Sequence, residues 1–155
     1  IRIPAMFPIM FKSSLDWDLT GEAEPGLDRR RLYLPRGRII GGCSSINAMI
    51  YLRGNRADYD ERAAGGATGW SYDEILPYYK RGEDNERGEN EFHGVGGPQA
   101  VADSRSMHTL VDLMMEAAVA AGIPANPDLT GATQDGVGRF QLTQKNGMRH
   151  STADA

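Results

Sequence analysis

The sequence contains a single cysteine, Cys43, and no apolar run long enough to cross a membrane. One cysteine excludes an internal disulfide and is typical of a reducing compartment. A membrane-spanning helix needs about 20 apolar residues, whereas the apolar stretch 3–11 is interrupted by Pro4 and Pro8. This stretch also lacks the charged start and the cleavage pattern of a signal peptide. We therefore expect a cytoplasmic protein, or one whose full-length form associates with a membrane.

An excess of basic charge is also missing. The 17 basic and 21 acidic residues give a net charge of −4, which argues against nucleic-acid binding because that function needs a basic face. The run 29–31 of three arginines is too short for such a patch and favours a solvated loop before a strand. The three histidines, His93, His108 and His150, do not have metal-ligand spacing with each other or with Cys43. The sequence therefore predicts no metal site.

What the sequence does contain is a concentration of small residues in the stretch 37–54, whose first half reads Gly-Arg-Ile-Ile-Gly-Gly-Cys-Ser-Ser. Small residues let a backbone approach something large and flat, or anionic. The run 44–51 is capable of forming a short buried helix, and Ser44 or Ser45 can cap it. The pattern Gly-x-Ser-x-Gly is absent, so neither serine is predicted to be a nucleophile. The stretch predicts a loop-to-helix cradle for a ligand.

Other local signals predict the surrounding elements. Ser71 and Glu74 have the spacing of a capping box, and apolar residues recur at helical spacing between Met107 and Ala121. Asn146 and Gly147 predict a tight turn. The full expectation is mostly loop over 1–28, a strand over 31–35, helices over 56–64, 71–83 and 107–121, a long loop over 84–97, and strands over 99–102 and 137–143.

The stretch 37–54 resembles the first signature of the glucose–methanol–choline (GMC) oxidoreductases, which are FAD-dependent alcohol oxidases and dehydrogenases. Cys43 departs from the family pattern, which more often has Gly, Ser or Thr there. The resemblance is to a choline-dehydrogenase-type member and covers nearly the whole chain. Its further motifs are Arg53-Gly-Asn55, Asp58-Tyr-Asp60, Gly69-Trp-Ser-Tyr72, Phe92-His-Gly94, Gly97-Pro98, Asp128-Leu-Thr-Gly131, Gln134-Asp-Gly136 and Asn146-Gly-x-Arg-x-Ser151.

The resemblance implies an α/β (mixed α+β) fold class. Residues 1–100 would be part of an FAD-binding dinucleotide fold, and residues 101–155 would begin the substrate or cap region of the family. A dinucleotide fold should also carry Gly-x-Gly-x-x-Gly, but Gly136-Val-Gly138 continues with Arg-Phe-Gln. In the family this fingerprint precedes the present segment and the catalytic histidine follows it. We therefore expect an internal fragment that is inactive alone and carries no catalytic base.

The resemblance also assigns cofactor contacts. The glycines and Ser44 would approach the pyrophosphate or the ribityl chain of FAD, and the residues from Asn47 onward would lie near the isoalloxazine ring. Some family members attach FAD covalently through a histidine at a position matching Ile46 or Asn47, so this chain is predicted to bind FAD non-covalently. The implied cofactor-binding residues are Arg36, Gly37, Gly41, Gly42, Ser44, Asn47, Ala48, Met49 and Ile50.

The function implied by the resemblance is oxidation of the CH–OH group of a choline-like or other primary alcohol, with hydride transfer to flavin N5. The partners would be the small alcohol and an electron acceptor, which is oxygen or another molecule. A lyase of the same family that cleaves cyanohydrins, and a non-catalytic Gly-rich interaction module, are the alternatives. His93 lies in a family loop motif, Phe-His-Gly, and is expected to have a structural role.

Overall fold

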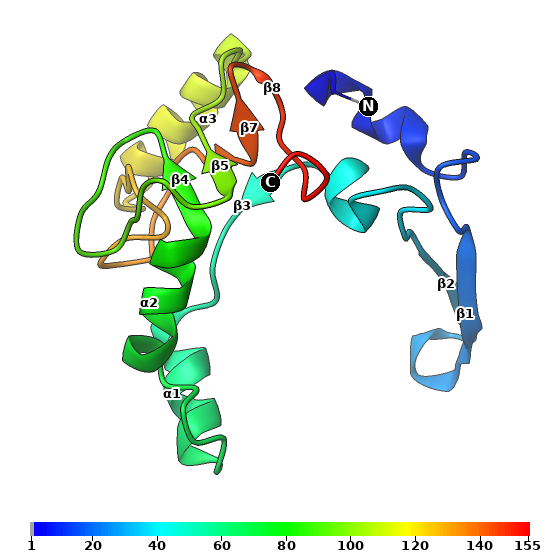
Figure 1. Cartoon of the computed structure of the whole chain (residues 1–155), viewed down its shortest axis with the longest axis horizontal. Helices are drawn as coiled ribbons and strands as arrows, with labels where there is room; N and C mark the ends of the chain where they lie inside the picture. Colours follow the sequence, from blue (N-terminus) through cyan, green and yellow to red (C-terminus); the bar gives the residue numbers. More distant parts are fainter. Residues whose placement is uncertain (1) are drawn as a thin grey trace. The chain divides into compact units, whose positions relative to one another are not determined.

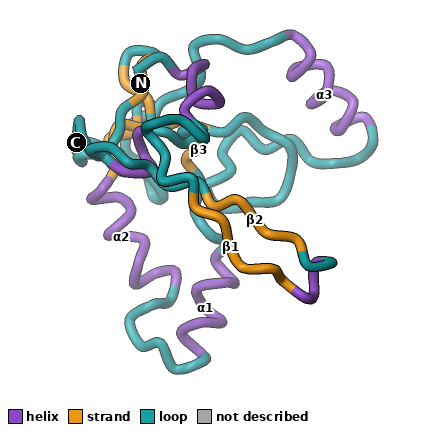
Figure 2. The backbone as a smooth tube through the Cα atoms, turned by 90° about the vertical axis from the view of Figure 1, so that its right-hand side faces the viewer, coloured by secondary structure: helices purple, strands orange, loops and turns teal. Residues whose placement is uncertain are grey.

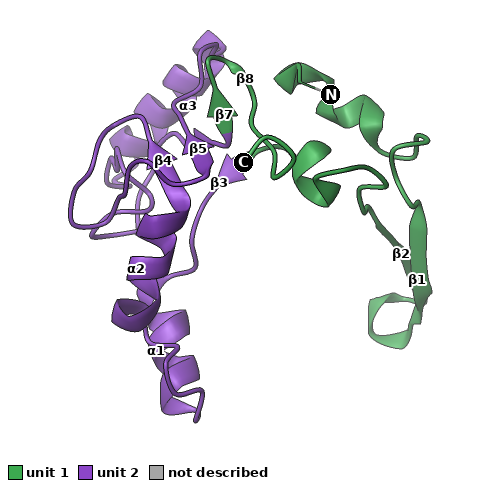
Figure 3. Ribbon diagram, in the orientation of Figure 1, with its two compact units in different colours: residues 1–49, 144–155 green, residues 50–143 purple. Residues whose placement is uncertain are grey.

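A computed structural model describes residues 2–155 as a mixed α/β chain that divides into two compact units (Figure 1, Figure 3). Unit 1 contains residues 1–49 and 144–155, and unit 2 contains residues 50–143. The expected domain boundary at residue 100 stays a prediction, because compact units are defined by contacts between residues and not by the domains of a family. Within the described residues, no helix is long and apolar enough to cross a bilayer.

Unit 1 is built from short elements and antiparallel hairpins, of which the longer, β1–β2, is seen in Figure 2 as a pair of adjacent strands. A second small hairpin, β7–β8, turns at Asn146 and Gly147, whose φ angles are 54° and 74°. This is the tight turn that the Asn-Gly pair predicts. The elements are the 3₁₀ helices η1 (Pro4–Met10), η2 (Pro25–Leu27) and η3 (Gly42–Ser45), and the strands β1 (Leu19–Glu24), β2 (Arg30–Leu34), β7 (Gln144–Lys145) and β8 (Met148–Arg149).

Unit 2 contains the three α-helices and two small sheets. Strands β4 and β5 pair in parallel, with Glu83 opposite Gln99, and β3 pairs antiparallel with β6. The side chain of Glu74 accepts a hydrogen bond from the backbone N–H of Ser71 at 3.1 Å, so the predicted capping box is formed. The elements are β3 (Ile50–Tyr51), α1 (Arg56–Ala64), α2 (Tyr72–Gly82), β4 (Glu83–Asn85), β5 (Gln99–Val101), α3 (Thr109–Ala120) and β6 (Gln141–Leu142).

The helix expected over residues 44–51 is wrong. The chain forms only the single 3₁₀ turn η3 and then passes into β3. Met49 has a φ of 63°, in the left-handed region, and its N–H donates to Oδ1 of Asn47 at 3.0 Å. Asparagine competes with helix formation in this way, because its side chain offers the backbone a local partner. The cradle is therefore a loop with one tight turn.

Three other expectations also need correction. Residues 1–28 are not mostly loop, because η1 and β1 lie within them. The strand expected over 137–143 is reduced to β6, because Val137 pairs with the segment 124–126 instead: its N–H donates to the carbonyl oxygen of Pro124 and its carbonyl oxygen accepts from the N–H of Asn126, both at 2.8 Å. The close approach of these two backbones holds residue 138 outside the sheet. The loop expected over 84–97 also starts later, since Asp84 and Asn85 belong to β4.

Candidate cofactor site

A cavity of about 220 Å³ lies in unit 1 beside the small-residue stretch. Three of the nine predicted cofactor-binding residues line it: Arg36, Asn47 and Ala48. The loop 35–48 supplies most of the wall, and one aromatic side chain comes from the N-terminal segment. The lining residues are Phe11, Pro35, Arg36, Cys43, Ile46, Asn47 and Ala48.

The three predicted glycines have different surroundings. A Cβ at Gly37 would lie 2.1 Å from the carbonyl oxygen of Gly42, and a Cβ at Gly41 would lie 2.5 Å from Oγ of Ser45. These two positions need glycine because the cradle packs on itself there. Gly42 has a φ of 54°, and a Cβ built on it meets nothing within 4 Å. Of the three, Gly42 is the one with open space beside its backbone.

The two serines hold the turn instead of capping a helix. Ser44 Oγ lies 2.6 Å from the carbonyl oxygen of Gly41 and accepts a hydrogen bond from the backbone N–H of Thr152 at 3.0 Å. Ser45 is buried and donates to the carbonyl oxygen of Ile40 at 2.9 Å. The expected capping role is therefore wrong for both serines. Their hydroxyls tie the turn to neighbouring backbone instead.

Asn47 is held by a residue far along the chain. Nη1 of Arg149 donates to Oδ1 of Asn47 at 2.8 Å and to the carbonyl oxygen of Ser44 at 2.8 Å, and Nη2 donates to the carbonyl oxygen of Asn47 at 2.7 Å. Arg149 is only 3% exposed, and burial lowers its pKa. One buried guanidinium thus fixes the backbone and the side chain of the cradle together.

Asp16 fixes the other wall of the cavity. Its Oδ1 accepts a hydrogen bond from the backbone N–H of Arg36 at 2.9 Å, and its Oδ2 accepts from the N–H of Lys12 at 2.9 Å and from the hydroxyl of Tyr33. The hydrogen bond from Tyr33 is the main cause that holds the pKa of Asp16 well below its usual range. The carboxylate is therefore ionised and sets the path of the chain into Arg36.

The last two predicted cofactor contacts, Met49 and Ile50, differ in burial. Met49 is buried, and its Sδ accepts a hydrogen bond from Nε2 of Gln144 at 3.8 Å. Ile50 is 51% exposed and begins β3, which belongs to unit 2. Met49 therefore forms part of the packing under the cradle. Ile50 is half exposed at the start of β3.

A second buried polar cluster lies in unit 2, around His93. Its Nδ1 lies 2.9 Å from Oε1 of Glu83, and its Nε2 lies 2.9 Å from Oδ2 of Asp128. Nη2 of Arg53 donates to Oε2 of Glu83 at 2.9 Å, and the backbone N–H of Gly94 donates to Oε1 at 2.9 Å. Both ring nitrogens of His93 face carboxylates, so the ring fits best as a doubly protonated cation.

The electrostatics of this cluster agree with that protonation state. The hydrogen bond to Glu83 raises the pKa of His93 against the effect of burial, and Asp128 adds to the rise. Burial alone would raise the pKa of Glu83, but hydrogen bonds from His93 and other neighbours and the charge of Arg53 outweigh it and lower the pKa to about 2. His93 is 1% exposed. The cluster ties β4 to two loops, which is the structural role expected for His93.

The other histidines lie outside both clusters. His108 is exposed, and its Nδ1 accepts a hydrogen bond from the N–H of Leu110 at 3.2 Å at the start of α3. His150 is half-buried in unit 1. Over the described residues, no three His, Cys, Asp or Glu side chains gather in a way that could hold a metal ion.

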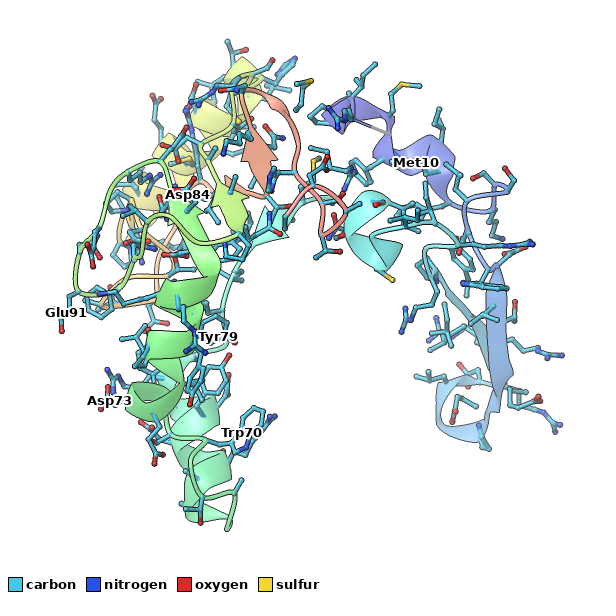
Figure 4. The ribbon with its side chains drawn as sticks, viewed as in Figure 1. Met10, Trp70, Asp73, Tyr79, Asp84 and Glu91 are labelled. Atoms are coloured by element: carbon cyan, nitrogen blue, oxygen red, sulfur yellow. The ribbon has the colours of Figure 1, made fainter. Side chains whose placement is uncertain are left out.

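Unit 2 also carries an aromatic cavity of about 490 Å³ at α1 and α2. Trp70 precedes α2 and Tyr79 lies on it, as labelled in Figure 4. Tyr59 and Tyr79 share a hydrogen bond of 2.7 Å between their hydroxyls. The residues that line this cavity are Tyr59, Gly69, Trp70, Ile75, Tyr78 and Tyr79. None of the nine predicted cofactor-binding residues is among them.

Sequence reasoning missed the residues that hold the site in place. Arg149 belongs to a quoted motif, but the motif does not say which atoms its guanidinium reaches. Asp16 lies in a segment without any recognisable pattern. Glu83 and Asp128 are ordinary charged residues until the fold brings them to His93.

Residues 12–155 match the sequence model of the GMC oxidoreductases. The chain belongs to the GMC oxidoreductase family. Among curated relatives, the oxygen-dependent choline dehydrogenase of Photobacterium profundum is 42% identical over 141 residues, which is 90% of this chain and 25% of that protein. The enzyme of the same name from Brucella ovis is 39% identical over 157 aligned positions, which is 100% of this chain and 28% of that protein. The chain thus spans about a quarter of the length of these relatives.

Solved structures agree with this assignment. Pyridoxine 4-oxidase from Mesorbium loti is 33% identical, with a TM-score of 0.91 over 99% of this chain and 31% of that one. An FAD-dependent oxidoreductase from Chaetomium thermophilum is 25% identical, with a TM-score of 0.79 over 89% of this chain and 26% of that one. The GMC family and these neighbours support FAD as the cofactor and confirm the mixed α/β fold class predicted from the sequence.

Proposed function

We propose that the protein of which these residues form part is an FAD-dependent oxidoreductase that acts on the CH–OH group of a small, choline-like alcohol. The observation that carries the proposal is the 39–42% identity to choline dehydrogenases over 90–100% of this chain. The cavity lined by Arg36, Asn47 and Ala48 supports it, since these residues are among those that the family resemblance places along FAD.

The residues present fit such a cofactor. Gly42 combines a left-handed backbone with open space on its Cβ side, which suits close approach of a large ligand. Arg36 contributes a positive charge, and Asn47 contributes an amide next to apolar walls. Typical ligand pockets measure about 300–1,000 Å³, so a cavity of about 220 Å³ covers only part of a dinucleotide.

When bound, FAD would supply the hydride acceptor for alcohol oxidation. The role of this chain is then to bind and orient the cofactor. Gly42 would allow contact with the backbone, and Asn47 would offer a side-chain hydrogen bond. No residue of this chain is proposed as the catalytic base. The attachment is proposed to be non-covalent, because Ile46 has no nucleophilic atom and the amide nitrogen of Asn47 is a very poor nucleophile.

The sequence relatives and the structural neighbours favour different alcohols as the substrate. The choline dehydrogenases are the more similar relatives in sequence, so choline is the first candidate substrate. Pyridoxine 4-oxidase is a structural neighbour at 33% identity, which favours a ring-bearing primary alcohol as the second candidate. The electron acceptor is proposed to be oxygen or another small acceptor.

The test is a substrate panel on the full-length protein. Oxidation of choline, pyridoxine, methanol and a cyanohydrin would be followed both by oxygen uptake and by reduction of an artificial electron acceptor. We expect choline to give the highest kcat/KM. A preference for pyridoxine would replace the first candidate with the second. Cleavage of the cyanohydrin without oxidation of any alcohol would refute an oxidoreductase and favour a lyase.

A further inference from the structure

The hydrogen bonds of Asn47 determine which end of its amide faces the cavity. Oδ1 accepts from Nη1 of Arg149 and from the N–H of Met49. Both partners can only donate, so the oxygen must face them and the amide cannot flip. Within the described part of the chain, Nδ2 of Asn47 donates to no other group. This NH₂ is therefore the polar end that remains, on a side chain that lines the cavity.

Arg149 controls this arrangement through three hydrogen bonds. Its guanidinium spans Oδ1 of Asn47 and the carbonyl oxygens of Ser44 and Asn47 at 2.7–2.8 Å. Hydrogen bonds from a charged donor are about twice as strong as neutral ones. The planar guanidinium also has a fixed geometry that a lysine ammonium cannot reproduce. Three hydrogen bonds from one buried guanidinium therefore hold residues 44–47 in the observed conformation.

We propose that Arg149 is the positioning residue of the cofactor cradle, and that it presents the NH₂ group of Asn47 as a hydrogen-bond donor to the polar edge of the flavin ring. This inference rests on the proposed function, because it takes FAD as the occupant of the cavity. Arg149 would not touch the cofactor. It would act through Asn47, and its effect would be on the electronic properties of the bound flavin.

The consequence is a change in redox behaviour. A flavin ring carries more electron density at its polar edge after reduction, so a donor held at that edge stabilises the reduced form. Without Arg149, the amide of Asn47 would lose its fixed orientation, and its NH₂ group would no longer be held toward the polar edge of the flavin ring. We expect the reduced form to lose about tenfold in relative stability, which is a downward shift of about 30 mV for a two-electron couple.

The experiment measures the reduction potential of bound FAD, the FAD content and the melting temperature in the full-length protein. The variants are Arg149→Met, Arg149→Lys, Asn47→Leu and the double variant Arg149→Met/Asn47→Leu. Arg105→Met is the control, because Arg105 is an exposed arginine of unit 2 that pairs with Glu86. We expect Arg149→Met to lower the potential, Arg149→Lys to lower it nearly as much, and Arg105→Met to leave it unchanged.

The double variant distinguishes positioning from a direct effect of charge. If Arg149 acts through Asn47, then Arg149→Met causes no further shift in the Asn47→Leu background. An unchanged shift in that background would mean that the arginine charge acts on the flavin directly and would overturn the inference. An Arg149→Met protein with lower melting temperature but unaltered potential would show a merely structural role and would also overturn it.

If Arg149→Met loses its FAD, the reduction potential is measured in two milder variants instead. Arg149→Lys keeps the charge, and Asn47→Asp keeps the acceptor for Arg149 while it removes the NH₂ donor. Arg149→Lys retains the positive charge beside the loop and Asn47→Asp retains the acceptor for Arg149, so both should load FAD and show a lowered potential. A wild-type potential in both would overturn the inference. Failure of the wild-type protein to bind any FAD would instead refute the proposed function itself.

Discussion

Asn47 and Arg149 lie 102 positions apart, yet Nη1 of the arginine donates to Oδ1 of the asparagine at 2.8 Å. The β7–β8 hairpin makes this contact possible, because it brings Arg149 of β8 back to the cradle. Gln144, opposite Arg149 in the hairpin, donates to Sδ of Met49 from the same side. The hairpin therefore acts as a clamp on the cradle loop, and the first prediction concerns its turn.

We expect Gly147→Val to weaken the clamp. Gly147 has a φ of 74°, and a β-branched residue in the left-handed region costs about 1–2 kcal/mol. The full-length variant should lose about that much stability and bind FAD more weakly, because Arg149 is held less firmly. Thermal melting and a fluorescence titration with FAD measure the two effects. Gly26→Val is the control, since Gly26 lies in unit 1 with open space and no positive φ; equal FAD affinity in both variants would contradict the clamp.

A second prediction concerns the open side of Gly42. A valine there would place two methyl groups where we expect the cofactor to lie, so Gly42→Val should abolish FAD loading. Gly88→Val is a matched control, because Gly88 also has a positive φ, at 93°, and open space around it. The control carries similar backbone strain away from the cradle, and should load FAD normally. The measurement is the ratio of flavin to protein absorbance after purification, and equal ratios in the two variants would contradict the site.

A third prediction concerns the flavin linkage. Neither Ile46 nor Asn47 offers a nucleophile, so FAD should be released when the full-length protein is precipitated with acid. The yellow colour should then appear in the supernatant. Ile46→His would supply an imidazole at a position where some family members attach the cofactor, and a fraction of its flavin should stay with the precipitate. Flavin retained by the wild-type precipitate would show a covalent bond and contradict the prediction.

A fourth prediction concerns pH and the His93 cluster. The pKa of His93 is raised from 6.5, so its stabilising contribution is present below pH 6.5 and is lost as the pH rises through the folded-state value. The pKa of Glu83 is lowered from 4.5 to about 2, so its contribution is present above pH 4.5 and is lost as the pH falls toward 2. The cluster should therefore stabilise the protein most between about pH 4.5 and 6.5.

His93→Gln tests this dependence. Removal of one partner from a buried ion network costs about 3–5 kcal/mol, so the variant should melt well below the wild type at pH 5.5. The difference should become smaller as the pH rises above the folded-state pKa of His93. His108→Gln is the control, because His108 is exposed and its Nδ1 accepts from the backbone N–H of Leu110 rather than facing a carboxylate. A difference between His93→Gln and wild type that does not change with pH would show that charge on His93 is not important.

Local signals in the sequence predict local structure well. The helix α1 begins after Asn55, whose side chain accepts a hydrogen bond from the N–H of Ala57 at 3.0 Å, and α2 begins at the capping box of Ser71 and Glu74. The apolar repeat predicts α3. Strand β1 was missed although Leu19, Gly21 and Ala23 alternate with polar residues, because Gly, Ala and Glu are depleted in strands. It forms a hairpin with β2, in which Glu24 lies opposite Arg30, and this pairing stabilises residues whose own strand propensity is low.

The location of the candidate site could be predicted from the sequence, but the role of each residue in it could not. The small residues of the cradle and their family motif predict where a cofactor binds, and Arg36, Asn47 and Ala48 do line one cavity. The motif does not show that Gly37 and Gly41 are needed for packing, or that Ser44 is bonded to Gly41. Those roles depend on which backbones touch in three dimensions. The assignment of the nine residues to FAD contacts stays a prediction.

The central claim is that these residues hold FAD in a protein that oxidises an alcohol. The most direct measurement mixes the purified full-length protein with choline in the absence of oxygen and follows the absorbance of its flavin. We predict that the yellow oxidised flavin bleaches completely, and that admission of an electron acceptor restores it. A protein that carries no flavin, or whose bound flavin stays oxidised with choline and with every other alcohol tried, would contradict this account.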